Sequence, residues 1–581
     1  MKNLYRYFIL TLLVVLTSCS DNFLNVTPDG RVTLDDVFAN TRLTESYLNS
    51  IYNSRQSYGT AYHYWTMQAG FTDEAQDSDA LSQSWTPVAR WARGDINVSI
   101  RPFQGGGASQ GSGNSGWYYE KNWEAIRKAN IFLANIDEAN VPIASERARM
   151  KAEARILRAF FYMEQIKMYG PMPVIDEPIP EVFDFGSLER GSFEAAVNLI
   201  VEDLDAAIAE PALPYRVSEP ERGRFSKALA YHLKSEALVF NASPLWNPDN
   251  DQAKWQRAAT ASKEALDNLT TNGYELFGDY EEYFHNSRDL GSSPSDRETI
   301  WEIKDFNMTA SFSILVFRMH NIPIPGATAD KAGAAPSQNL VDAYDMADGS
   351  MPILGYSDEQ NLEPIINPIS GYDDSDPYVN RDPRFYATVW YDGAEYGVVN
   401  GELQHVESYQ GGGQGLSSGR NRTHTGYYLR KFRDPAVTSA NAGNSKFPKY
   451  RLAETYLFVA EAENEANGPT TEAYDAINAV RDRAGMPDLP VGLSKEEMRE
   501  RIRRERQVEL SYEEKRFWDV RRWEIIDEKE RYITGMRWTS DGDNDRILVQ
   551  ARGHYEDKFL LFPIPLNEMN RLQTFEQNPG W

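Results

Sequence analysis

The sequence contains one cysteine, Cys19, among 581 residues. It therefore has no second cysteine for an intrachain disulfide and no cysteine cluster for a metal. The seven histidines show no His-Glu-x-x-His pattern and no other paired ligand spacing. They stand at positions 63, 232, 285, 320, 405, 424 and 554. The common cysteine- and histidine-based metal sites are therefore not expected.

Basic residues are scarce relative to acidic ones. The chain has 60 lysines and arginines against 86 aspartates and glutamates, which gives a formal net charge of −26 at pH 7. Proteins bind nucleic acids and anionic membranes mainly through Lys and Arg, which neutralise the phosphate charge. We therefore expect neither nucleic acid nor an anionic lipid surface as a partner.

Long apolar runs are missing except near the first residues. Lys2 and Arg6 precede an apolar stretch over residues 8–16, which is too short for a lasting membrane helix. A short apolar stretch behind positive charges, followed by small residues, is the pattern of a secretory signal peptide. We therefore expect residues 1–18 to be removed on export.

The single cysteine stands where such a signal would end. The string LTSC at residues 16–19 is similar to a bacterial lipobox, in which the cysteine carries the lipid. Each buried methylene contributes ~0.8 kcal/mol, so several acyl chains anchor a protein permanently. We expect a lipidated Cys19, a tether over residues 19–30, and no thiol left for catalysis. An ordinary signal peptide cleaved near a cysteine is the alternative.

Amphipathic periodicity predicts a mainly α-helical protein. In residues 145–169, apolar residues recur at steps of three and four until Gly170-Pro171 ends the pattern. Similar patterns predict helices over residues 118–138, 193–209, 225–241, 253–270, 449–467, 471–484 and 494–514. Paired helices of this length are typical of a degenerate tetratricopeptide-like scaffold of helical hairpins.

Residues 271–448 have a different character. They are rich in Gly, Pro, Asn and Asp, with strand-like pieces at 299–304, 386–391 and 427–432. We expect a large, irregular, loop-rich region packed on the helical layer. Long loops in a compact protein usually carry function.

Catalytic motifs are not evident. A Gly-x-Ser-x-Gly string around Ser109 lies in a run of Gly and Ser, without the strand that a nucleophile elbow requires. The turn from Asp541 to Arg546 is similar to the start of a calcium loop, but Arg546 and Arg552 stand where an EF-hand needs Gly and Glu. A loosely bound Ca²⁺ and a solvated acidic turn both remain open there. We expect no catalytic residue, no enzyme activity and no cofactor.

Tryptophans are concentrated early in the chain, in sequence broken by Gly, Pro and Ser that predicts a loop. Exposed aromatic rings on a firm scaffold offer flat apolar faces, and the C–H face of a pyranose ring stacks on such faces. Carboxylates such as Asp73 bind sugar hydroxyls. The sequence therefore predicts a glycan site with Trp65, Asp73, Trp85 and Trp91, of which Trp85 and Trp91 are the strongest candidates. The alternative for each of these tryptophans is that it packs in the core.

Five stretches form an ordered set of motifs. They are EARILRAFFYMEQIKMYGPMPVI (153–175), FPKYRLAETYLFVAEAENEANG (447–468), INAVRDRAGMP (477–487), RIRRERQVELSYEEKRFWDVRRW (501–523) and FPIPLNEMNRLQTFEQNPGW (562–581). Together with WEAIRKANIFLANI (123–136) and the Cys19 start, they resemble the SusD/RagB family of Bacteroidetes outer-membrane nutrient-binding lipoproteins. Charges of alternating sign at helical spacing in 501–523 predict a salt-bridged helix end. Motif residues such as Arg158, Arg451 and Glu454 are therefore predicted to maintain the fold, not to contact a ligand.

The resemblance implies a SusD-like fold that forms a single domain over residues 31–581. The helical scaffold would span about 31–270 and 447–525, the ligand-binding region about 271–446, and a C-terminal tail 526–581.

The resemblance also implies a function. The protein would be a surface-exposed, lipid-anchored lid on a SusC-like TonB-dependent outer-membrane transporter, to which it delivers a captured oligosaccharide. The central region would complete the glycan site, with Phe312, Arg318, Arg384 and Tyr391 as candidates and Trp301 better suited to the core. A lid that binds peptides and a tetratricopeptide-type protein-interaction scaffold are the alternatives.

Overall fold

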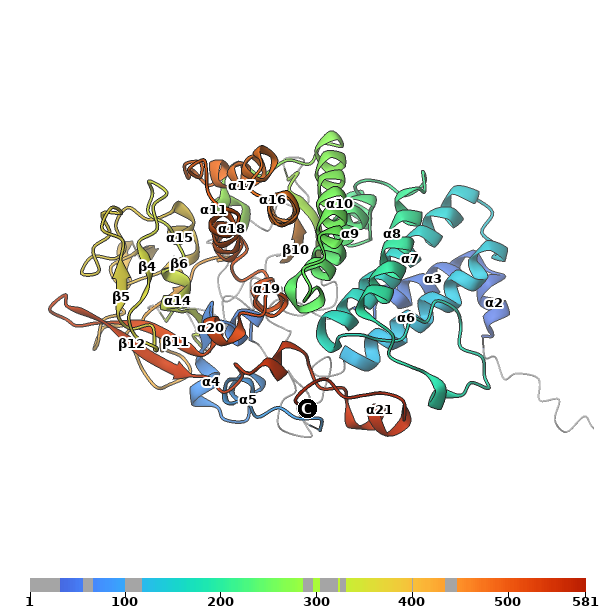
Figure 1. Cartoon of the computed structure of the whole chain (residues 1–581), viewed down its shortest axis with the longest axis horizontal. Helices are drawn as coiled ribbons and strands as arrows, with labels where there is room; N and C mark the ends of the chain where they lie inside the picture. Colours follow the sequence, from blue (N-terminus) through green and yellow to red (C-terminus); the bar gives the residue numbers. More distant parts are fainter. Residues whose placement is uncertain are drawn as a thin grey trace, which may run out of the picture.

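The computed structural model describes residues 32–55, 66–99, 118–285, 296–303, 322–323, 331–399, 401–433 and 447–581. Helices dominate, and the longer ones form a curved layer that crosses the molecule (Figure 1). The helices of this layer are α3 (Thr41–Tyr52), α6 (Tyr118–Asn135), α7 (Ala144–Tyr169), α8 (Phe193–Ile208), α9 (Lys227–Ala242), α10 (Gln252–Thr271), α16 (Leu452–Asn467), α17 (Thr471–Arg483) and α18 (Lys495–Glu509). Helix α10 packs on α9 and also on α16, so two distant parts of the chain form one layer. The protein is mainly α-helical, as predicted.

Polar N-cap residues begin these helices. Ser192, Ser226 and Thr470 each accept a hydrogen bond from a backbone N–H in the first turn, and Ser494 forms a capping box with Glu497. Loss of one such cap costs about 1 kcal/mol. Amphipathic periodicity and caps together explain why the predicted helices are confirmed.

One helix ends earlier than its periodicity predicts. Helix α18 stops at Glu509, because Tyr512 and Glu514 adopt φ values of 63° and 62° that an α-helix does not allow. The resulting turn brings the carboxylate of Glu513 within 2.8 Å of Lys431 and 2.7 Å of Arg451. Ion pairing thus overrides the helical pattern over residues 510–514.

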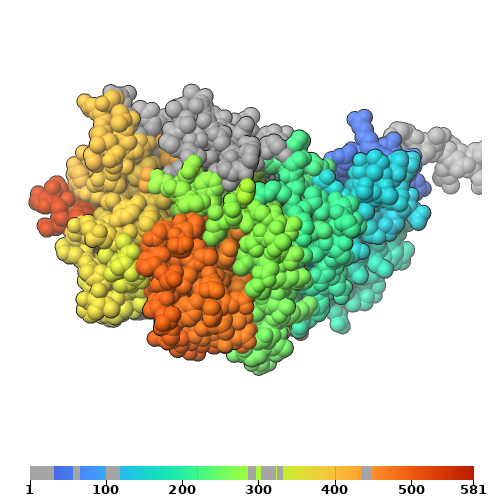
Figure 2. Space-filling view, turned by 90° about the horizontal axis from the view of Figure 1, so that it is seen from above, coloured from blue at the N-terminus to red at the C-terminus, as the bar shows by residue number. Residues whose placement is uncertain are grey.

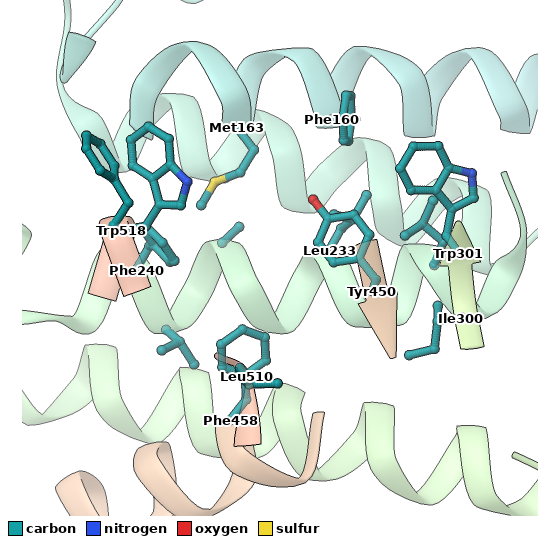
Figure 3. Packing of buried hydrophobic residues seen from close by; sticks show 14 of the residues in the cluster. Phe160, Met163, Leu233, Phe240, Ile300, Trp301, Tyr450, Phe458, Leu510 and Trp518 are labelled. Atoms are coloured by element: carbon teal, nitrogen blue, oxygen red, sulfur yellow. The ribbon is translucent and has the colours of Figure 1, made fainter. Parts of the chain in front are cut away.

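The core lies between α7, α9 and α16. Figure 3 shows Phe160 and Met163 of α7 in the same cluster as Phe240 of α9. The ring of Trp301 lies 6.1 Å from that of Phe160, and its indole N–H donates to the carbonyl of Gly223 at 3.0 Å. The predicted place of Trp301 in the core is therefore confirmed.

Strands are short and pair two by two in antiparallel ladders. The pairs are β1 (Ala75–Asp77) with β3 (Ala334–Pro336), β2 (Thr299–Ile303) with β10 (Phe447–Arg451), β4 (Ile353–Tyr356) with β5 (Pro364–Ile366), β6 (Val389–Trp390) with β9 (Tyr428–Leu429), β7 (Glu395–Val399) with β8 (Glu402–His405), and β11 (Tyr532–Trp538) with β12 (Asn544–Ala551). In the first pair Ala75 stands opposite Pro336 and Asp77 opposite Ala334. This pairing joins the early part of the chain to the central region.

Short helices fill the remaining segments. They are α2 (Leu34–Phe38), α4 (Ser78–Ser82), α5 (Pro87–Arg93), α11 (Tyr280–His285), α14 (Gln338–Val341), α15 (Pro383–Thr388), α19 (Arg516–Arg522), α20 (Ile526–Glu530) and α21 (Leu566–Arg571). No helix in the described ranges has both the length and the apolar character needed to cross a membrane.

Two of these helices correct the sequence-based expectations. The early stretch predicted as a loop contains α4 and α5, because Thr86 caps α5 and Pro87 occupies its first turn. The piece predicted as a strand over 386–391 is mostly the end of α15, and only Val389–Trp390 is extended. Both helices, α5 and α15, begin with a proline in the first turn, and their other residues are of types typical of loops or strands, so the sequence pattern did not predict them.

Candidate functional site

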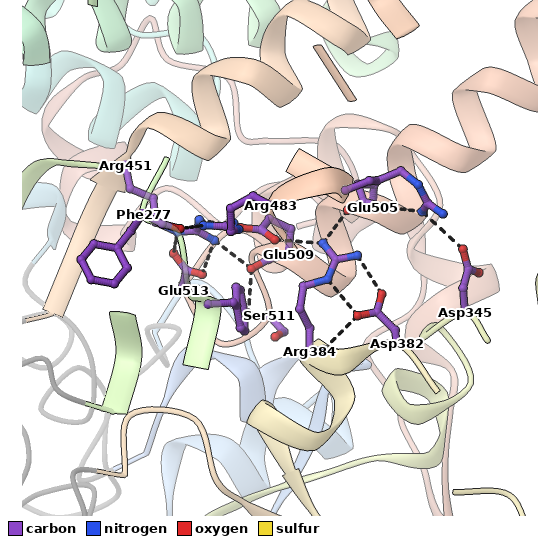
Figure 4. Close-up of polar contacts among 12 residues, drawn as sticks. Phe277, Asp345, Asp382, Arg384, Arg451, Arg483, Glu505, Glu509, Ser511 and Glu513 are labelled. Carbon is purple, nitrogen blue, oxygen red and sulfur yellow. Dashed lines mark hydrogen bonds and ion pairs between the residues drawn. The ribbon is translucent and has the colours of Figure 1, made fainter. Parts of the chain in front are cut away.

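Arg384 belongs to a buried ion-pair network and is not a ligand contact, which corrects the prediction. Its guanidinium binds the carboxylate of Asp382 at 2.8 Å and that of Glu509 at 2.9 Å, and it also pairs with Glu505 (Figure 4). The side chain is buried among these groups. A guanidinium that is neutralised on both sides has no capacity left for a sugar.

The same network extends to Arg451 at the end of β10. Arg451 contacts the carboxylates of Glu298 at 2.7 Å, Glu509 at 2.6 Å and Glu513 at 2.7 Å. Although burial raises the pKa of Glu509, the neighbouring arginines more than offset it and hold that pKa well below its usual range. Arg158 similarly pairs with Asp203 at 2.7 Å. The prediction that such motif residues maintain the fold is therefore confirmed.

Asp73 is likewise engaged within the protein. Its two carboxylate oxygens accept hydrogen bonds from the guanidinium of Arg516 at 2.8 and 2.7 Å, so that the early segment is fastened to α19. The side chain is buried. The prediction that Asp73 offers its carboxylate to sugar hydroxyls is wrong for this structure, because Arg516 occupies both oxygens.

Glu74, the next residue, gives the stability a defined pH dependence. Burial, with the charge of Asp73 adding to it, raises the pKa of Glu74 from 4.5 to about 8. Between these values the folded protein keeps a proton that the unfolded chain has lost, so this group makes stability fall as pH rises from about 4.5 to about 8. Glu74→Gln should therefore raise the melting temperature at about pH 8 and leave it nearly unchanged at about pH 4.5. Thermal unfolding across this range tests the prediction, and a difference that does not vary with pH contradicts it.

Trp91 fills the core, which also corrects the prediction. It is 1% exposed, and its ring centroid lies 4.9 Å from that of His554 and 5.5 Å from that of Phe517. Helix α5 turns the indole inward, so neither face is available for stacking. Trp85, just before α5, is half-buried and keeps part of its surface exposed.

The remaining predicted residues divide into two groups. Tyr391 is half-buried beside β6, with its ring 4.4 Å from that of Tyr378. Cys19, Trp65, Phe312 and Arg318 lie outside the described residues. Of the five candidates that the structure describes, Asp73, Trp91 and Arg384 are buried, and only Trp85 and Tyr391 keep part of their surface exposed.

A cluster of charged groups marks the join between the early part of the chain and the central region. The ammonium group of Lys331 lies 3.1 Å from carboxylate oxygens of both Asp77 and Asp79. Arg420 binds Asp79 through two nitrogens, at 3.0 and 3.1 Å, and its side chain remains 41% exposed. The backbone continues the join, since Ala332 N–H donates to the carbonyl of Arg420. We call this region, with the aromatic residues described next, the junction.

Aromatic rings lie beside these charges. Ala332, directly after Lys331, belongs to a small apolar cluster that includes Trp390. The ring of Tyr396 packs against that of Trp390, with 5.0 Å between the two ring centroids. The buried indole N–H of Trp390 has no acceptor among the described residues. The hydroxyl of Tyr396 accepts a hydrogen bond from Arg433 at 2.9 Å. Ala332 thus links the charged groups to this aromatic cluster, because its backbone N–H binds the carbonyl of Arg420 and its side chain belongs to the cluster.

The described residues do not form a metal-binding cluster. Within the described ranges, no three His, Cys, Asp or Glu side chains are placed to hold a metal ion. In the acidic turn after β11, Asp545 pairs with Arg537 and Arg546 with Asp342. A solvated acidic turn and a loosely bound Ca²⁺ stay the two alternatives for this turn. At the junction the available interactions are hydrogen bonds, ion pairs and ring contacts.

Sequence reasoning missed Lys331, Arg420 and Trp390. Trp390 lies inside the piece that was recognised as strand-like, next to the predicted Tyr391. Nothing in the local sequence distinguishes Lys331 or Arg420 from other surface cations, because their partners come from residues 77–79. The pairing of β1 with β3 brings residues 75–77 next to residues 334–336, and this proximity is visible only in the structure.

Family models match the chain in two parts. The model described as "SusD family" matches residues 297–581, and the model described as "Starch-binding associating with outer membrane" matches residues 22–236. Together the two matches cover the helical layer except α10 and the end of α9, and they cover the central region from residue 297 onward.

Individual SusD-like proteins are also similar to this chain. SusD-like protein P25 of Formosa agariphila is 24% identical over 475 residues, 77% of this chain and 75% of the relative. A SusD-like protein of Bacteroides fragilis superposes with a TM-score of 0.74 at 24% identity, over 95% of this chain and 99% of that one. A SusD-like carbohydrate binding protein of the same organism superposes with a TM-score of 0.70 at 21% identity, over 93% and 100%. At these identities the structural likeness establishes the fold.

Proposed function

Because the chain belongs to the SusD/RagB family, we propose that it is a glycan-binding lipoprotein of the outer membrane. It captures oligosaccharides at the cell surface and delivers them to a SusC-like TonB-dependent transporter, on which it sits as a hinged lid. The description of the family model for residues 22–236, which names starch binding and association with the outer membrane, supports the ligand class and the location.

The observation that carries this proposal is the composition of the junction. Sugar hydroxyls bind to charged donors and carboxylates, while the C–H faces of sugar rings pack on aromatic rings. Arg420 offers a partly exposed guanidinium, and Tyr396 adds a partly exposed ring that packs on Trp390, in the same apolar cluster as Ala332. The net charge of −26 disfavours polyanions as ligands, so neutral glycans fit best.

Delivery requires only binding equilibria. A lipid on Cys19 would hold the protein at the membrane and keep its concentration over the transporter high, so modest sugar affinity suffices. Ligand contacts shared by the lid and the channel would favour the closed state through differential binding. No bond is made or broken in this cycle, and it needs neither a catalytic residue nor a cofactor.

Binding assays test the proposal. We expect the protein to be retarded in native gels that contain one or more neutral polysaccharides, and to bind the matching oligosaccharide in calorimetry. The double variant Arg420→Ala with Tyr396→Ala should lose at least about tenfold in affinity, or about 1.4 kcal/mol. Arg537→Ala is the matched control, because Arg537 also pairs with one aspartate and its side chain is 47% exposed.

Two results would contradict the proposal. The first is equal loss of affinity in Arg420→Ala with Tyr396→Ala and in Arg537→Ala, which would place the site elsewhere. The second is binding of peptides but not of glycans in a parallel screen, which would favour the peptide-binding lid.

A further inference from the structure

A groove is lined by residues other than those of the junction. It measures about 1130 Å³ and lies between α18, α20, the 488–493 loop and residues 339–369, including β4. Figure 2 shows residues 340–370, in yellow, next to the orange segment that contains α16 to α18. Sites for small ligands usually measure about 300–1,000 Å³, so this groove has room for an extended ligand. None of the junction residues lines it.

One wall of the groove is basic. Helix α18 contributes Arg501, Arg503 and Arg504, all half-buried. Arg501 and Arg504 share one carboxylate, that of Asp345, at 2.8 and 3.0 Å. Among the described residues, Arg503 forms an ion pair with Glu500 alone, at 3.1 Å, and it packs over the ring of Trp523. Burial lowers the pKa of Arg501 and of Arg503, and neighbouring arginines add to this effect, so nearby carboxylates do not fully offset the cost of burying these two charges.

Several of the lining carboxylates are already engaged. Asp348 accepts hydrogen bonds from Ser350, and Asp358 accepts three from backbone N–H groups of its own turn. Glu497 caps α18, and Asp342 is bound by Arg546. These four carboxylates therefore serve local structure, while Asp488, Glu496, Glu500 and Glu528 also line the groove and are exposed. In the arginine wall, the buried Nε of Arg503 has no acceptor among the described residues and keeps donor capacity.

The opposite wall is apolar. All four residues of β4 line the groove, and Leu354 is 55% exposed. Ile369, also in the lining, is 83% exposed. Among the described residues of the lining, Tyr356 is the one aromatic residue, and its hydroxyl is bound to Asp342. The described lining thus offers one ring for stacking, fewer than the rings gathered around Trp390.

The strand β4 offers a further feature. Among the described strands, β4 pairs only with β5, so its other edge has no strand partner. An extended peptide binds such an edge through main-chain hydrogen bonds, and its successive side chains then point to opposite faces. The lining of the groove supplies both aliphatic side chains, such as Leu354 and Ile369, and the arginines of α18 as contacts for the side chains of such a strand.

We propose that the groove is a docking site for an extended segment of a partner protein in which aliphatic and acidic residues alternate. The aliphatic residues pack on Leu354 and Ile369, and the acidic residues bind the arginines of α18. This contact is separate from glycan capture, and it gives the protein a second, protein-directed surface.

An octapeptide of alternating leucine and glutamate, labelled with fluorescein, is the probe. We expect saturable binding to the full-length protein by fluorescence anisotropy. The corresponding leucine–lysine peptide should bind more weakly at the groove, even though the net charge of −26 attracts it. In hydrogen exchange of the wild type, the acidic peptide should protect amides of residues 353–356, a readout that needs no variant.

Two substitutions and their controls locate the site. Arg503→Glu and Leu354→Asp should each weaken peptide binding at least tenfold and leave glycan binding unchanged. Arg571→Glu is the control for Arg503→Glu, because Arg571 also pairs with a glutamate three residues before it in a helix. Leu403→Asp is the control for Leu354→Asp, because Leu403 also lies in a hairpin strand and is 50% exposed. Both controls should bind the peptide normally.

The remaining outcomes overturn the proposal. They are the absence of peptide binding and of amide protection, equal losses in the control variants, and binding of oligogalacturonate that Arg503→Glu abolishes while the peptide fails to bind. The last of these would make the groove a site for acidic sugars.

Discussion

Replacing Arg451 by methionine should lower the free energy of unfolding by about 3–5 kcal/mol, because it leaves buried carboxylates without their counter-charge. Arg451 pairs with Glu298, Glu509 and Glu513, and all four side chains are buried. Methionine keeps much of the volume, so the expected loss comes from uncompensated charge and not from a cavity. Urea unfolding followed by tryptophan fluorescence measures the effect.

A surface pair provides the control for this experiment. Arg537 binds Asp545 with both side chains about half exposed, and such pairs contribute at most about 1 kcal/mol. Arg537→Met should therefore change stability little. If Arg451→Met unfolds at the same urea concentration as Arg537→Met, the network does not hold the helical layer and the central region together.

Trp91→Ala should destabilise the protein by about 3–5 kcal/mol, the range found when large aromatic side chains are removed from cores. The indole packs against Phe517, Phe559 and Phe562, which belong to the last part of the chain. Its removal leaves a cavity that joins α5, α19 and the C-terminal segment. Glycan affinity of the folded fraction should not change.

Trp85→Ala, compared with Trp91→Ala, distinguishes an effect on stability from an effect on glycan binding. Trp85 is half-buried, so its loss should destabilise the protein less than that of Trp91. Thermal unfolding and affinity electrophoresis of both variants provide the comparison. A Trp91→Ala protein that is as stable as the wild type but has lost its glycan affinity would contradict the assignment of Trp91 to the core.

The helical layer was predictable from sequence because its signals are local. Apolar spacing and N-cap residues such as Ser494 lie within the helix they specify. Trp91 was misplaced because its environment is not local: its carbonyl accepts from His554, 463 residues further along. Neighbouring Gly, Pro and Ser residues indicated a loop, whereas burial depends on what packs there in the fold.

The charged residues show the same distinction. Helical spacing in residues 501–523 correctly predicted salt bridges, but it did not identify their partners. Arg516 pairs with Asp73 and Glu505 with Arg384, across long stretches of chain. A carboxylate in sequence is equally suited to a sugar hydroxyl or to a distant guanidinium. Asp73 and Arg384 were therefore wrongly predicted to contact a glycan, although the regions that contain them do pack together.

The most direct test of the account is a crystal structure of the protein with the oligosaccharide that binds best in the polysaccharide screen. The account predicts sugar rings at the junction, within hydrogen-bond distance of Arg420 and beside Tyr396. An oligosaccharide bound in the groove along α18, with the junction empty, would contradict it.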